Sequence, residues 1–184
     1  MANEPENSVT TEPSGESYEL PQGDHPLEVA ACLNNLGEVA RQRGNLEAAQ
    51  AHHRASRRLR EEIGNRIGVA YSDNNLGDVL TAQGDFDAAY QHYRQAVRLA
   101  LEVDAVPAAV YILAGVARWH AQRRDWEHAA HLLGAVQTSA DARDVKDRIE
   151  ALLKTLSAHV AAPQLQAWLE RGAARSLKDW AESL

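Results

Sequence analysis

Histidine and cysteine are the side chains in this sequence that could bind a metal ion or act as a nucleophile. The chain has eight histidines and one cysteine, and His128 and His131 stand three residues apart, where two imidazoles on one helix could share a metal ion. No partnering cysteine and no His-Glu signature accompany them, and His53 falls at a position of the predicted core. Cys32 has no obvious base nearby and is predicted to be a small buried residue. We therefore expect no metal site.

Other arrangements that carry out chemistry are missing from the sequence. It has no glycine-rich phosphate loop of the GxxxxGK[ST] type, no nucleophile beside a base and no convergent carboxylates. The four arginines between residues 54 and 60 could form a nucleic-acid patch, but Glu61 and Glu62 follow them directly, so a solvated face is expected. We expect no enzyme activity, no cofactor and no direct binding of nucleic acid.

Charge is distributed unevenly along the chain. Residues 1–23 hold five acids, three prolines and no lysine or arginine, a composition that predicts a disordered acidic tail. They contribute −5 of the formal net charge of −7, so −2 remains for residues 24–184, too little to attract nucleic acid or anionic lipid. The start of the chain lacks the basic and apolar regions of a signal peptide, and no stretch approaches ~20 apolar residues. Together with the lone cysteine, which fits a reducing compartment, this predicts a cytoplasmic protein without a membrane partner.

A repeat of forty residues is the strongest pattern in the chain. Residues 34–49 read NNLGEVARQRGNLEAA, and residues 74–89 read NNLGDVLTAQGDFDAA. Three rows of this length, 24–63, 64–103 and 104–143, keep the same positions in register, and the first two match at 15 of 40 positions. Such a period indicates a repeat architecture, and the length of the chain fits one domain with its own apolar core.

Each row is predicted to form two antiparallel helices joined by a short turn. At residues 43–45 and 83–85 a glycine can end one helix in the left-handed conformation, and the next residue, Asn45 or Asp85, can cap the following helix. In the third row Arg124 and Asp125 keep the cap without the glycine. Large residues are expected opposite small ones, with Leu46, Phe86 and Trp126 facing Gly37, Gly77 and Ala117. A further core column is expected at Leu36, Leu76 and Val116.

These rows resemble the tetratricopeptide repeat, in the long-helix variety of bacterial signalling proteins and kinesin light chains. The resemblance rests on Asn-Leu-Gly in the first helix, followed by Gly, Asn or Asp, a large apolar residue and Ala-Ala at the second. It implies an all-α, right-handed superhelical solenoid of three helical hairpins. Residues 144–184, with apolar residues at helical spacing from Val145 to Val160, are expected to form capping helices. In that segment Gly172 is predicted to end one helix, and Ser176 to cap the last one.

The C-terminal part is similar to a second group of proteins. HLLGAVQTSADA at residues 131–142 and QAWLERGAARSLKDWAESL at residues 166–184 resemble the repeat region of large LuxR-type and ATP-dependent bacterial transcriptional regulators. Those proteins carry nucleotide-binding and often DNA-binding domains ahead of their repeats. The resemblance implies a free-standing or truncated relative of such regulators.

The first helix of each row would line a concave groove in such a solenoid. The resemblance implies that the asparagine before Leu-Gly hydrogen-bonds the backbone of a bound peptide, for which an amide offers both a donor and an acceptor. The alternative is that the asparagines satisfy one another and the nearby backbone, and that the tyrosines only pack. The residues expected to bind a partner are Asn34, Asn35, Glu38, Tyr71, Asn74, Asn75, Asp78, Tyr111 and Arg118.

Two functions follow from these patterns. The first is a protein-interaction scaffold, and because Glu38 and Asp78 stand where relatives that grip chaperone carboxylates place Lys and Arg, its partner is expected to be a polar or basic protein segment. The second is a sensory, regulatory or self-association module of a bacterial transcriptional regulator. Self-association is open because the first helix of the first row has no predicted lid.

Overall fold

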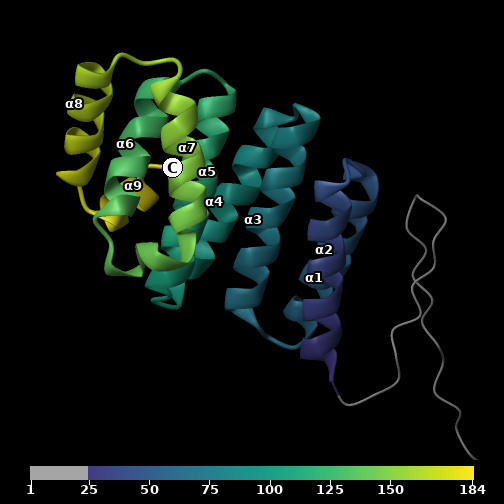
Figure 1. Cartoon of the computed structure of the whole chain (residues 1–184). Helices are drawn as coiled ribbons and strands as arrows, with labels where there is room; N and C mark the ends of the chain where they lie inside the picture. Colours follow the sequence, from purple (N-terminus) through teal and green to yellow (C-terminus); the bar gives the residue numbers. More distant parts are fainter. Residues whose placement is uncertain (1–24) are drawn as a thin grey trace, which may run out of the picture.

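The computed structural model describes residues 25–184, apart from the side chain of Asp144, and this part of the chain is all-helical (Figure 1). The predicted acidic tail at residues 1–23 lies outside the described residues. Among the helices of residues 25–184, none combines the length and the apolar character that crossing a bilayer requires. The elements are α1 (Pro26–Gln42), α2 (Leu46–Glu62), α3 (Arg66–Gln83), α4 (Phe86–Glu102), α5 (Val106–Gln122), α6 (Trp126–Gln137), the 3₁₀ helix η1 (Ala140–Val145), α7 (Lys146–Ser157), α8 (Ala162–Ala173) and α9 (Leu177–Glu182).

The turns within the helix pairs have the predicted chemistry. Between α3 and α4, Gly84 adopts φ 84° and Asp85 accepts a hydrogen bond from the backbone N of Ala88 at 3.1 Å. The turn between α1 and α2 is built in the same way. Between α5 and α6, Arg124 takes the left-handed conformation at φ 62°, which residues with a Cβ rarely adopt, and Asp125 is the cap. The predicted caps are confirmed.

A ring from the second helix packs on a glycine of the first helix in two of these pairs. A Cβ added at Gly37 would lie 2.7 Å from Cε1 of His53, and one added at Gly77 would lie 2.7 Å from Cε1 of Tyr93. Both rings are completely buried. The glycines therefore allow the backbones of α1 and α3 to approach α2 and α4 closely.

The prediction that Leu46 and Phe86 face Gly37 and Gly77 is wrong, because the rings of His53 and Tyr93 make those contacts. Leu46, Phe86 and the equivalent Trp126 are the first residues of their helices and are half-buried beside the turns. In an antiparallel pair, residues equally distant from the turn lie opposite each other, so a glycine seven residues before the turn meets a ring well inside the second helix.

Hydrogen bonds from two arginines join α2 to α3. Arg57 Nε donates to Asp73 Oδ1 at 2.8 Å, and Arg60 Nη1 donates to the carbonyl of Gly68 at 2.9 Å and to Ser72 Oγ at 3.0 Å. These arginines connect two helix pairs, whereas the sequence had suggested only a solvated face.

The C-terminal helices cover the last pair. α7 packs on α5, α8 on α6, and α9 against α4, α5 and α6. Gly172 lies inside α8 and does not end it: a Cβ there would lie 1.8 Å from the carbonyl oxygen of His131, so glycine is needed for the close crossing of α8 over α6. The predicted cap of α9 is confirmed, because Ser176 Oγ accepts from the backbone N of Asp179 at 3.1 Å.

The other end of the chain of helices is open. Leu36 is 51% exposed, whereas the equivalent Leu76 and Val116 are 1% and 0% exposed. Cys32, predicted to be buried, is also exposed. Both predictions fail because no other described helix covers this face of α1.

Candidate partner-binding groove

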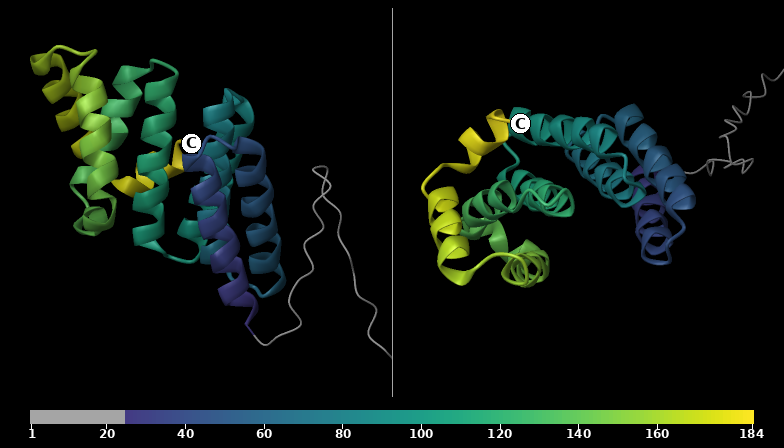
Figure 2. Two further views of the ribbon diagram at one scale, coloured as in Figure 1. Left: turned by 45° about the vertical axis from the view of Figure 1, so that its right-hand side comes forward. Right: turned by 90° about the horizontal axis from the view of Figure 1, so that it is seen from above.

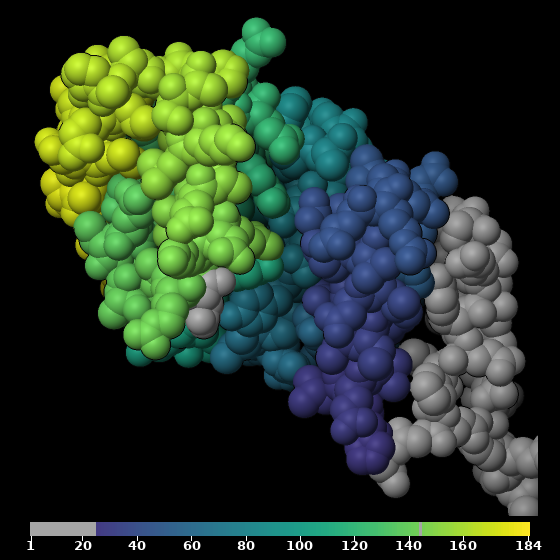
Figure 3. Space-filling model, viewed as in Figure 1, coloured from purple at the N-terminus to yellow at the C-terminus, as the bar shows by residue number. Residues whose placement is uncertain are grey.

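The first helices of the pairs lie side by side and form one surface. α1 contacts α3, α3 contacts α5, and α5 contacts α7. Seen from above, this row is bent, with α1 and α7 at its two ends (Figure 2). The space-filling view shows the surface hollowed between α1 and α7, with α3 and α5 at the floor (Figure 3). The residues predicted to bind a partner lie on α1, α3 and α5.

The asparagines connect α1 to α3. Asn75 Nδ2 donates to Asn34 Oδ1 at 2.8 Å, and Asn74 Nδ2 donates to Asn75 Oδ1 at 3.2 Å. Asn74 is fully buried and Asn75 is 8% exposed, whereas Asn34 is half-buried and Asn35 is exposed. This chain of amides is the arrangement that the alternative interpretation described, and it leaves Asn35 as the asparagine most accessible to a partner.

The third pair accommodates the buried Asn74. A Cβ at Gly115, the residue that replaces the asparagine of the first two rows, would lie 2.7 Å from Asn74 Oδ1. That oxygen has no hydrogen-bond partner within residues 25–184. An asparagine at position 115 would therefore collide with the side chain of Asn74.

Asp78 is the centre of a buried charge cluster. It is 5% exposed, its Oδ1 accepts from the Tyr93 hydroxyl at 2.7 Å, and it forms ion pairs with Arg118 and, at 3.9 Å, with Arg148. Burial by itself raises the pKa of the Asp78 carboxyl, but the two guanidinium groups and the hydrogen bonds from Arg118 and Tyr93 together leave that pKa below its ordinary value. The same carboxylate raises the pKa of Arg118. Asp78 thus anchors the arginines from within the fold.

Two tyrosines and Arg148 form the wall beside this cluster. The rings of Tyr71 and Tyr111 meet edge to face with centroids 5.3 Å apart. The Arg148 guanidinium lies 3.9 Å from the centroid of Tyr111, and its Nη2 donates to the Tyr111 hydroxyl. Both tyrosines are half-buried, so each packs against its neighbours and remains partly accessible.

Glu38 is held by its own helix. Its carboxylate accepts from Arg41 at 2.7 and 2.9 Å and from Gln42 at 2.9 Å. The hydrogen bond from Arg41 is the main cause of the lowered pKa of Glu38, and it outweighs partial burial, which raises that pKa. Both predicted acids of the groove are therefore ion-paired inside the protein.

An apolar cavity of about 450 Å³ opens between α5 and α7. The sequence did not predict the residues of α7 that line this cavity, including Arg148, because they lie outside the repeat. It did contain a signal for the ion pair at the cavity: the equivalent residues Glu38 and Asp78 are acidic, whereas Arg118 is basic. This change of charge in the third row suggests that Arg118 pairs with an acid of the second row. The lining includes Ala114, Arg118, Ala121, Arg148, Ala151 and Leu152.

Comparison with known proteins adds one match. The family model described as the tetratricopeptide repeat matches residues 28–102 and, again, residues 67–136. The two matches are displaced by about one forty-residue period and together span more than half of the chain. No curated protein matches the chain.

Proposed function

The chain belongs to the tetratricopeptide repeat family, whose repeats generally mediate protein–protein interaction, and from this premise we propose that it is a non-catalytic scaffold. Its helix pairs, three in this proposal, form a right-handed superhelix, and the hollow between α1 and α7 takes a segment of a partner protein. The cavity between α5 and α7 is the observation that carries this proposal, because it is open, largely apolar and edged by arginines.

The contacts refine the chemistry of the partner. A polar or basic segment was expected from Glu38 and Asp78, but Arg41 neutralises the first and Arg118 and Arg148 the second. Of the two we propose the polar segment, which inserts one apolar side chain between Ala121 and Ala151 and makes backbone hydrogen bonds farther along the hollow. The exposed amide of Asn35 offers a donor and an acceptor for such bonds.

A substitution that blocks the cavity tests this proposal. Ala151 is exposed and lines the cavity, so the indole ring of Ala151→Trp should occupy the cavity without disturbing the core. Proteins captured by immobilised wild type from native-cell extract are quantified by mass spectrometry against those captured by Ala151→Trp and Asn35→Ala. The control is Ala162→Trp, which adds the same ring at an exposed residue of α8. We expect Ala151→Trp to capture at least about tenfold less of the specific partners than wild type, and Asn35→Ala to reduce their capture by a smaller factor. Equal capture by all four proteins would refute the proposal.

Self-association as a module of a bacterial transcriptional regulator is the second candidate. The open face of α1 favours it, because Leu36 and Val39, which lie three residues apart on one side of the helix, are 51% and 43% exposed. Light scattering of wild type and Leu36→Glu separates the two functions, since only self-association predicts that the charge converts a dimer into a monomer. For either function we place the protein in the cytoplasm, where an exposed thiol such as that of Cys32 stays reduced.

A further inference from the structure

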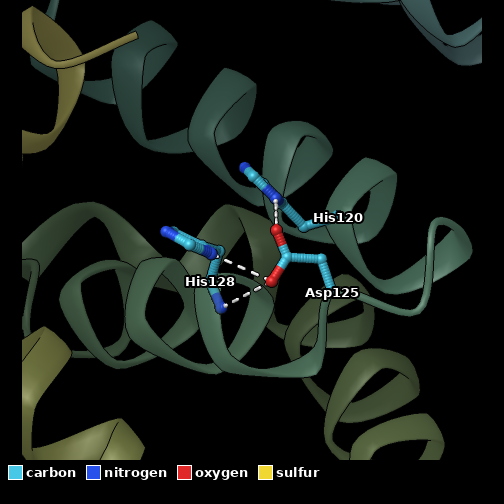
Figure 4. Close-up of side chains that lie close together, drawn as sticks. All are labelled: His120, Asp125 and His128. Carbon is cyan, nitrogen blue, oxygen red and sulfur yellow. Dashed lines mark hydrogen bonds and ion pairs between the residues drawn. The ribbon is translucent and has the colours of Figure 1, made fainter.

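Three side chains converge at the turn between α5 and α6. His120 lies near the end of α5, Asp125 caps α6, and His128 lies in the first turn of α6. Their ligand atoms all lie within 4.8 Å of one another. Figure 4 shows the two imidazoles on the same side of the turn, with the carboxylate of Asp125 between them. The sequence had paired His128 with His131, but those ring centroids are 6.3 Å apart and His120 was missed.

Both oxygens of the carboxylate are engaged by the imidazoles. His120 Nδ1 lies 2.8 Å from Asp125 Oδ2, and His128 Nδ1 lies 2.9 Å from Asp125 Oδ1. The two rings are stacked, with centroids 5.3 Å apart and planes at 18°. The backbone beneath them is fixed, since the N of Asp125 donates to the carbonyl of His120 at 2.9 Å.

The earlier rows provide an internal comparison. Their equivalent caps, Asn45 and Asp85, have no imidazole nearby in the repeat: the positions of His120 are Ala40 and Leu80, and those of His128 are Ala48 and Ala88. A capped turn therefore folds without either histidine. Both histidines appear together in the third row and both face the shared acid, so capping alone does not explain them.

We propose that His120, Asp125 and His128 bind a late first-row divalent cation such as Zn²⁺ through two imidazole nitrogens and one carboxylate. Such ligand sets suit zinc and its neighbours in the first transition series. Ligand atoms in a tetrahedral zinc site lie roughly 3.3 Å apart, so each nitrogen needs to withdraw from its carboxylate oxygen by about half an ångström. The ligand atoms of the three residues lie within 4.8 Å of one another, so the two imidazoles also need to move toward each other. His128 can make this adjustment because its side chain is 59% exposed. Coordination through Nδ1 leaves the proton of each imidazole on Nε2.

The site leaves room for a fourth ligand. His120 and His128 line a cavity of about 500 Å³, whose walls include Trp119, Leu132 and Trp180. Water can occupy the open position from this side. Bound metal would clamp α5 to α6 under the C-terminal helices, and this proposal is independent of the groove.

The test uses the full chain, freed of metal by a chelator and titrated with Zn²⁺ in a calorimeter. The variants restore residues of the first row: His120→Ala, Asp125→Asn and His128→Ala correspond to Ala40, Asn45 and Ala48. Asp125→Asn keeps a side chain that caps α2 in the first row, so its fold should be retained. His25→Ala removes an exposed imidazole at the start of α1, outside the third helix pair, and is the matched control.

One Zn²⁺ per chain should bind wild type and the control equally, and each of the three variants should bind at least about tenfold more weakly. Co²⁺ should give the visible absorption of a tetrahedral site in wild type and lose it in Asp125→Asn. Zn²⁺ should also raise the melting temperature of wild type and not that of Asp125→Asn. The proposal is overturned if no saturable binding occurs, or if the three variants bind as tightly as wild type, in which case the cluster is a hydrogen-bonded cap only.

Discussion

Replacing His53 by phenylalanine should make the protein resist acid better than wild type does. The imidazole is completely buried against Gly37, and neither ring nitrogen meets a hydrogen-bond partner in the described part of the chain. Burial is the main cause that lowers the pKa of this imidazole from 6.5 to about 4 in the folded protein. Phenylalanine fills a similar volume and has no group that titrates or lacks a partner.

The size of the effect follows from linkage between protonation and folding. The unfolded chain takes up a proton at His53 near pH 6.5, while the folded protein does so only near pH 4. The stability contributed by the neutral ring is therefore complete above about pH 6.5 and is lost as the pH falls toward 4. Between pH 7.5 and pH 5, wild type should lose about 2 kcal/mol of unfolding free energy through this residue, and His53→Phe should not.

The assay is urea unfolding followed by circular dichroism at pH 7.5 and pH 5, with chelator present so that metal does not contribute. Other titrating groups change both proteins equally, so the difference between the variants isolates His53 provided the urea dependence stays the same. His25→Phe, at a side chain that is 71% exposed, is the control and should follow wild type. Parallel losses in wild type and His53→Phe would show that the buried ring is not held neutral and would refute the reasoning.

Two further predictions concern the packing that shapes the groove. Gly77→Ala should lower the unfolding free energy by about 1–3 kcal/mol, because the added Cβ would meet the ring of Tyr93. That ring cannot easily move away, since the Tyr93 hydroxyl donates a hydrogen bond to Asp78. A thermal melt unchanged within error would contradict the close contact between the helices. Arg118→Leu should cost about 3 kcal/mol by leaving the carboxylate of Asp78 buried with weaker partners. The double variant Arg118→Leu, Asp78→Asn should recover most of that loss in the same unfolding assay, and no recovery would mean that Arg118 acts through its packing and not its charge.

Local chemistry explains why the sequence predicted the helix pairs. A left-handed glycine followed by Asn45 or Asp85 stops one helix and starts the next with interactions among neighbouring residues, so it can be read without knowledge of the fold. Contacts between helices were harder to predict. Leu46 was predicted to lie opposite Gly37, but it is the first residue of α2 and lies too close to the turn, and the side chain that meets Gly37 is His53.

Exposure and site geometry depend on neighbours that a repeat does not encode. Leu36 and Leu76 occupy the same position in nearly identical sequences, yet Leu36 is exposed because α1 is the outermost described helix. Arg148 could not be placed at the groove, because α7 lies outside the repeat and its contact with α5 is purely tertiary. The residues proposed for the groove lie on the first helices of the pairs, as the repeat predicted, but the sequence could not show which of their side chains pair with one another.

The third row departs from the first two at residues that make specific contacts. Several of its departures meet a specific group: Gly115 leaves room for Asn74, Arg118 pairs with Asp78, and His120 faces Asp125. The first two complement the second helix pair, and the third complements the cap of its own row. A residue that only drifted would have no reason to match a neighbour in shape or charge. These three residues thus fit the third helix pair to specific neighbours, and it is the pair at which both the groove cavity and the proposed metal site are found.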